Sequence, residues 1–139
     1  MNKLVPMLIE LTLIAMLFMT ACSRSAAGEV KADLNKEFRL PVGQTAVIAG
    51  EGLTIKFEAV TSDSRCPQGV TCIWAGEAAC NVTVTLNKTP KPYTLIVGGS
   101  GTGQTVIQGY TLNFNVEPYP QAQKTTDKNS YVMIMKVSK

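Results

Sequence analysis

The residues best suited to chemistry in this chain stand close together between positions 63 and 78. Cys66 and Cys72 bracket a loop that contains proline and glycine, Arg65 precedes them, and the chain's only tryptophan, Trp74, follows. Two cysteines at this spacing can form a disulfide or act as a thiol pair. The chain contains no histidine, which removes most catalytic triads and most zinc sites. We therefore predict a structural or binding role for this segment, with no catalytic residue and no cofactor.

The N-terminal segment indicates which compartment these cysteines occupy. Lys3 precedes a mostly apolar run over residues 4–19, and small residues then lead to Cys22. This pattern resembles the lipobox of bacterial lipoproteins, in which the cysteine is lipid-modified and becomes N-terminal. We predict a signal peptide over residues 1–21, lipidation of Cys22, and an extracytoplasmic domain anchored to a bacterial membrane. A cleaved secretory signal and an uncleaved anchor are the alternatives. If the source has two membranes, Ser23 favours the outer membrane or the cell surface.

Outside the cytoplasm, disulfides persist, and each remaining cysteine can be assigned a role. We predict a Cys66–Cys72 disulfide, because the loop between them can bring their Cα atoms within bonding range. A redox-active pair is disfavoured, since the spacing is longer than Cys-X-X-Cys and no helix follows. Cys80 falls on the apolar face of a predicted strand, where it should be buried and inert. The three cysteines match no common zinc spacing, so we predict no metal site.

The residues around the cysteines support two interpretations that are compatible with each other. In the structural one, Asp63 caps the turn and Arg65 pairs with Asp63 or Glu77. Trp74 then covers the disulfide and closes one end of the core, and Gly76 supplies an unusual backbone conformation. In the functional one, Arg65 and Trp74 are partly exposed and are the candidate partner-binding residues, because Arg and Trp tend to dominate binding interfaces. The structural interpretation is favoured.

The segment 63–78, Asp-Ser-Arg-Cys-Pro-x4-Cys-x-Trp-Ala-Gly-x-Ala, resembles a motif of uncharacterised small bacterial lipoproteins and secreted β domains. In that family the motif lies between two β-strands. Weaker matches at residues 40–45, 110–112, 118–120 and 131–134 extend the resemblance over nearly the whole mature domain. The resemblance implies a fold and an extracytoplasmic address, and it implies no activity.

The elements that must position this segment show the period of β-strands. Apolar and polar residues alternate, turn residues interrupt them, and no stretch after the signal has a 3.6-residue apolar stripe. The predicted strands cover residues 38–42, 46–48, 53–60, 77–86, 93–97, 105–116 (one strand, or two broken near Gly109) and 131–137. The predicted fold is all-β: a compact antiparallel β-sandwich or partly open barrel of six to eight short strands, with one disulfide.

Length and charge complete the predicted organisation. The signal peptide (1–21) precedes the lipidated cysteine and a flexible tether (22–35), and residues 36–139 form a single β domain. The net charge is +3, and the basic residues are scattered, so nucleic acid is not an expected partner.

The sequence supports three hypotheses for the function. We predict a membrane-tethered, non-enzymatic binding or inhibitory module whose ligand is an envelope protein, a glycan or a hydrolase. One alternative is a structural or assembly lipoprotein of the cell envelope. The other, a thiol-redox or other cysteine-dependent enzyme, is disfavoured because no histidine is available to activate a thiol.

Overall fold

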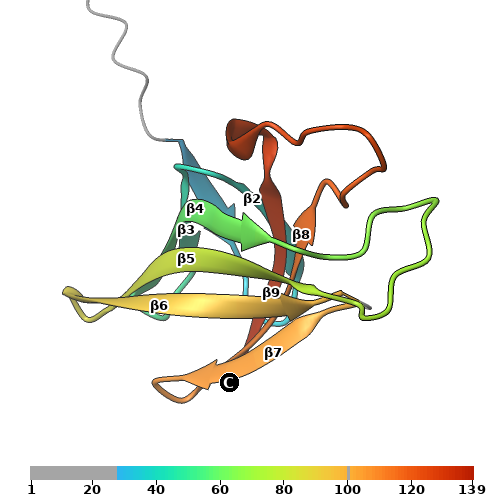
Figure 1. Cartoon of the computed structure of the whole chain (residues 1–139). Coiled ribbons are helices and arrows are strands. Elements are labelled where there is room, and N and C mark those ends of the chain that lie inside the picture. Colours follow the sequence, from blue (N-terminus) through green and yellow to red (C-terminus); the bar gives the residue numbers. More distant parts are fainter. Residues whose placement is uncertain (1–27, 100) are drawn as a thin grey trace, which may run out of the picture.

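Two β-sheets that pack face to face form the described part of the chain (Figure 1). The computed structural model describes residues 28–99 and 101–139. Within them a five-stranded sheet has the order β1-β3-β4-β5-β6, and a four-stranded sheet has the order β2-β9-β8-β7. The elements are β1 (Glu29–Ala32), β2 (Glu37–Pro41), β3 (Thr45–Ile48), β4 (Leu53–Asp63), β5 (Glu77–Leu86), β6 (Thr89–Gly98), β7 (Gly103–Ile107), β8 (Tyr110–Glu117), the 3-10 helix η1 (Lys128–Ser130) and β9 (Val132–Ser138).

The alternating sequence explains how the two sheets share one core. Along β5, β8 and β9 buried side chains alternate with more exposed ones, which are mostly polar in β5 and β8 and include Val132 and Ile134 in β9. Apolar residues from both sheets therefore meet between them. The fully buried members include Phe57, Val82, Leu112, Met133 and Met135.

The predicted all-β, sandwich-like fold with a Cys66–Cys72 disulfide is confirmed, and the sheets do not close into a barrel. The predicted strand over residues 77–86 coincides with β5, and the region 105–116 is divided into β7 and β8 by a turn at Gln108 and Gly109.

The predicted tether over residues 22–35 is wrong for its last part. Residues 29–32 form β1, which pairs in parallel with β3 and buries Ala32 in the core. The strand has only four residues, with two apolar ones among them, so its period-two signal is weak. Its partner, β3, is not adjacent in sequence, so the pairing produces no pattern within the residues of β1 themselves. The domain therefore begins before residue 36, while the predicted signal peptide and Cys22 lie outside the described residues.

The strand directions give the sandwich two different ends. The β2–β3, β4–β5, β6–β7 and β8–β9 connections lie at one end, which we call the loop end (Figure 1). The β1–β2, β3–β4, β5–β6 and β7–β8 turns lie at the other, together with the C-terminus. Across residues 28–99 and 101–139, the structure has no helix with the length and apolar content that a bilayer span requires.

Candidate functional site

The β4–β5 connection, residues 64–76, projects from the loop end, and we call it the stapled loop (Figure 1). Backbone hydrogen bonds hold its two arms together: the Ser64 N–H donates to the Glu77 carbonyl at 2.8 Å, and the Cys66 N–H to the Ala75 carbonyl at 2.9 Å. Beyond these bonds the Cys66–Cys72 disulfide crosses the loop, with 5.9 Å between the Cα atoms. The loop is thus closed by backbone bonds and by a covalent bond.

Two glycines allow the backbone segments at the foot of this loop to approach each other closely. Gly76 has φ +69°, and a Cβ there would overlap the carbonyl oxygen of Ser64. A Cβ on Gly99, from the β6–β7 connection, would overlap the carbonyl oxygen of Ala75. The Gly99 N–H donates to the Gly76 carbonyl at 2.8 Å. The prediction that Gly76 supplies a special backbone conformation is confirmed.

A buried ion pair forms the base of the stapled loop. The Arg65 Nε donates to Asp63 Oδ1 at 2.8 Å and its Nη2 to Asp63 Oδ2 at 2.6 Å, and both side chains are almost fully buried. Asp63 Oδ1 also accepts the backbone N–H of Arg65 at 3.2 Å. Asp63 therefore caps the turn, as the sequence predicted, and it forms a two-pronged contact with the guanidinium.

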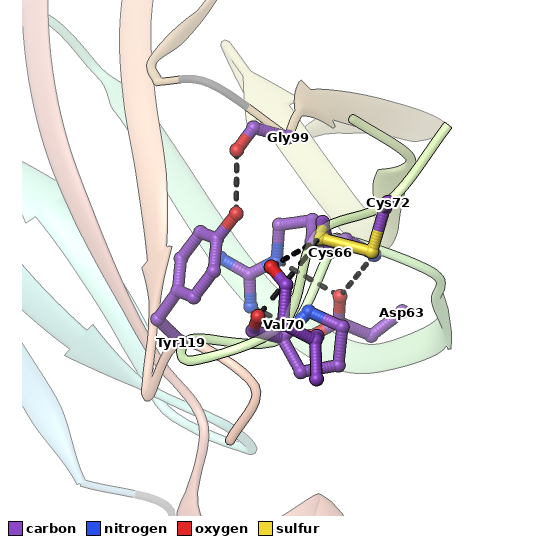
Figure 2. The surroundings of a disulfide bond; sticks show 8 residues. Asp63, Cys66, Val70, Cys72, Gly99 and Tyr119 are labelled. Atoms are coloured by element: carbon purple, nitrogen blue, oxygen red, sulfur yellow. Dashed lines mark hydrogen bonds and ion pairs between the residues drawn. A yellow bond between two sulfur atoms is a disulfide. The ribbon is translucent and has the colours of Figure 1, made fainter. Parts of the chain in front are cut away.

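Arg65 also connects the loop to the second sheet. Its Nη1 donates to the carbonyl of Val116 at 2.8 Å, and its Nη2 donates to that of Pro118 at 3.1 Å. The guanidinium carbon lies 4.8 Å from the centroid of the Tyr119 ring. The Tyr119 hydroxyl in turn donates to the Gly99 carbonyl at 2.6 Å (Figure 2). Arg65 thus joins the stapled loop to the end of β8 and to the β8–β9 connection, and Tyr119 extends this link to the β6–β7 connection.

Tyr131 completes this group, which we call the buried base: Asp63, Arg65, Tyr119 and Tyr131. Its hydroxyl donates to Asp63 Oδ2 at 3.0 Å. Burial opposes the charge on Asp63, but the hydrogen bonds and positive charge of Arg65 outweigh burial and hold the pKa of Asp63 below its ordinary value. Burial and the hydrogen bond to Asp63 raise the pKa of Tyr131. The buried base therefore holds a carboxylate and a guanidinium that neutralise each other.

The structure corrects the prediction that Arg65 is a partner-binding residue. Arg65 is only 2% exposed, and the carboxylate it pairs with is Asp63 rather than Glu77. Its four side-chain hydrogen bonds all go to Asp63 and to backbone carbonyls of the β8 end. Its position in the fold makes it a structural residue.

The prediction that Trp74 covers the disulfide and closes the core is also wrong. Trp74 is 79% exposed, Ile73 is fully exposed and Val70 is 49% exposed. We call these three residues the tip. The paired arms and the disulfide direct the loop away from the sandwich (Figure 1). Trp74 remains a candidate partner-binding residue.

Sequence reasoning missed several members of this site. Ile73 and Val70 are not among the predicted site residues, although Ile73 forms an apolar pair with Trp74 directly after the predicted disulfide cysteine Cys72. Tyr119 and Tyr131 reach the site from the β8–β9 side, more than fifty positions along the chain from Arg65. The weak matches at residues 118–120 and 131–134 include them but indicate no role.

The β8–β9 connection lies against the stapled loop. The Gln68 N–H donates to the Pro120 carbonyl at 3.0 Å, and Gln68 forms a bridge with Gln121. Between this connection and the end of β4 is a pocket of about 290 Å³, whose lining includes Lys124, Lys128 and Asp63. Because Asp63 is neutralised by Arg65, the two lysines supply the unbalanced charge of the pocket.

Cys80 lies in the core, as predicted, and is fully buried with a free thiol. Burial raises the pKa of this thiol to about 11. A thiolate is the reactive form of cysteine, so this environment suppresses reactivity. Within the described residues, no group of three or more Cys, Asp or Glu side chains is placed to hold a metal ion.

No protein-family model matches the chain, and no curated protein or solved structure matches it either.

Proposed function

We propose that this protein is a lipid-anchored, extracytoplasmic binding module without enzymatic activity, and that the stapled loop is its contact element. The observation that carries the proposal is the exposure of Ile73 and Trp74 on a loop whose base is immobilised. Exposed apolar side chains of this size, gathered on one projection, are typical of surfaces that bind something.

The construction of the loop supports a contact role over a purely structural one. Binding requires that the contacting groups lose conformational freedom, and a loop that is already ordered loses less. Here the disulfide, the paired arms and the buried base restrict the backbone before any ligand arrives. The exposed tip contributes little to the core, so stability alone does not account for an isoleucine and a tryptophan there.

The environment of Cys80 supports the non-enzymatic part of the proposal. A cysteine-dependent enzyme needs an accessible thiol of lowered pKa, and Cys80 is buried with a raised pKa. Cys66 and Cys72 are joined to each other.

The test is photo-crosslinking from the tip in native envelopes. The full lipoprotein would carry a benzophenone amino acid at position 73, which inserts into nearby C–H bonds of protein, glycan or lipid. The matched control carries it at position 106, since Val106 is an apolar residue that is 68% exposed on β7, towards the opposite end of the sandwich. Adducts that form from position 73 and not from position 106 support the proposal. Equal adduct yields from both positions would show that the tip contacts no ligand in preference to the rest of the surface. That result would overturn the proposal.

A further inference from the structure

We infer that the surface contacted by the tip is the lipid bilayer that holds the protein's own anchor, with Ile73 and Trp74 placed in the interfacial layer. This inference rests on the proposed lipid at Cys22. The bilayer is then the surface that the stapled loop binds. The protein has two attachments to the membrane, one through the covalent lipid and one through the tip of the folded domain.

The first argument is the side from which the chain enters the domain. Glu29 of β1 pairs with Thr45 of β3, and Thr45 pairs with Lys56 of β4. β4 then continues from Lys56 to Asp63, where the stapled loop begins. The N-terminal end of β1 therefore points toward the loop end, and Figure 1 shows the chain entering on the side where the β8–β9 connection lies. An anchor attached to this chain places the bilayer on the loop-end side.

The second argument is distance. Cys22 and Glu29 are seven residues apart in sequence, and at about 3.5 Å per residue the chain between them spans at most roughly 25 Å. Along the stretch of β4 from Lys56 to Asp63, the partners on β5 run from Thr83 to Ala78, because the pairing shifts at two points. This stretch therefore advances by about five strand residues, which at about 3.3 Å each is roughly 17 Å in the direction of the loop end. The foot of the stapled loop at Asp63 therefore lies within the roughly 25 Å that the anchor chain can span, and the tip projects beyond this foot. With the loop end facing the membrane, the tip reaches the surface.

The third argument is the chemistry of the tip. Residues 66–76 contain no charged side chain, so no charge has to be desolvated when this segment enters the interface. Tryptophan is enriched at the boundary between lipid and water, where its ring and its N–H both find suitable surroundings. A projecting apolar tip on a tethered domain has the features of an interfacial contact.

The charges around the tip indicate that this contact is apolar rather than electrostatic. Lys124 and Lys128 are exposed on the neighbouring connection, and Asp127 and Glu77 are exposed with the opposite sign. With both signs present, the rim gives little net attraction to anionic head groups. Contact with the bilayer should therefore change little with ionic strength, whereas a strongly acidic protein ligand would be released by salt.

Trp74 is the only tryptophan in the chain, so its intrinsic fluorescence reports directly on the tip. The full lipoprotein would be reconstituted in phosphatidylethanolamine–phosphatidylglycerol vesicles with and without acyl-chain-brominated phospholipid. We expect blue-shifted emission, quenching by the brominated lipid and protection from aqueous acrylamide, all independent of added salt. Ile73→Ser should weaken the quenching. The control is the double variant Trp74→Phe/Val106→Trp, which moves the fluorophore towards the opposite end of the sandwich and should be quenched by acrylamide and not by lipid.

Emission from Trp74 that stays red-shifted and open to acrylamide in vesicles would overturn the inference. It would leave the proposed function in place, with the tip free for a protein or glycan that the crosslinking from position 73 identifies. Equal lipid quenching of Trp74 and of the relocated tryptophan would also overturn it, because the domain would then lie on the membrane without a preferred end.

Discussion

The base and the tip of the stapled loop consist of residues of opposite polarity. The buried base is polar and charged, and each hydrogen-bonding group in it has a partner within the protein. The tip is apolar and faces outward, with Ile73 fully exposed. In a soluble protein the usual arrangement is the reverse, with apolar side chains inside and charges outside. This inversion within a single loop separates two tasks, since the base determines where the loop goes and the tip determines what it can contact.

The comparison also shows why a charged pair suits the base. An apolar cluster would hold the loop against the sandwich without fixing its direction, whereas Arg65 donates to two carbonyls on the β8 side and to both oxygens of Asp63. Hydrogen bonds of this kind depend on angle as well as distance. The tip can then remain uncovered because the loop does not need it for its own stability.

The largest expected effect follows from breaking the base at Arg65. Arg65→Ala leaves the Asp63 carboxylate buried without its partner, and such changes cost about 3–5 kcal/mol of unfolding free energy. The measurement is equilibrium urea unfolding of the protein, followed by circular dichroism.

The matched control is Arg39→Ala, which removes an ion pair to Glu117 between two exposed side chains. Exposed pairs contribute about 1 kcal/mol or less. Similar losses for the two variants would mean that the Arg65 pair is no more important than a surface pair, and that the base does not hold the loop.

A smaller effect is expected where two backbone segments cross at the foot of the loop. Gly76→Ala places a Cβ against the carbonyl of Ser64 and keeps a positive φ, so we expect a loss of about 2–3 kcal/mol. Gly43→Ala is the control, because Gly43 also has a positive φ, +82°, but has open space around its Cβ position. It should lose only about 1 kcal/mol. If the two variants lose the same amount, the strained φ alone accounts for the effect and the close crossing contributes nothing.

Most of the fold was predictable because it follows from local alternation. The bounds of β5 coincide with the predicted strand over residues 77–86, in which apolar and polar residues alternate from Cys80 onward. The disulfide was predictable from spacing and compartment. β1 was not, since four residues carry little periodic signal and their partner strand is parallel and distant.

The site was only partly predictable, and for a physical reason. The turn cap formed by Asp63 and the positive φ of Gly76 are local features of the backbone, so residue type indicates them. The positions of Arg65 and Trp74 depend on the path of the whole loop, which is set by contacts with Val116 on the other sheet and with Tyr119 in the β8–β9 connection. Residue type left a structural and a partner-binding interpretation open for both residues. The tertiary contacts give Arg65 the predicted pairing with Asp63 and leave Trp74 exposed instead of covering the disulfide.

The smallest expected effect on stability comes from the tip. Ile73→Ser removes an apolar side chain that has no neighbours in the fold, so the unfolding free energy in detergent solution should change by less than about 0.5 kcal/mol. The same substitution at Ile55, which is fully buried, should cost about 3 kcal/mol or more. A loss at Ile73 as large as that at Ile55 would mean that the tip packs against the domain, and the contrast between base and tip would fail. In vesicles, a contact made only by the folded tip stabilises the native state by its own binding free energy. A stability difference between the wild type and Ile73→Ser that appears with the bilayer and disappears without it therefore measures the contact itself, separately from the fold.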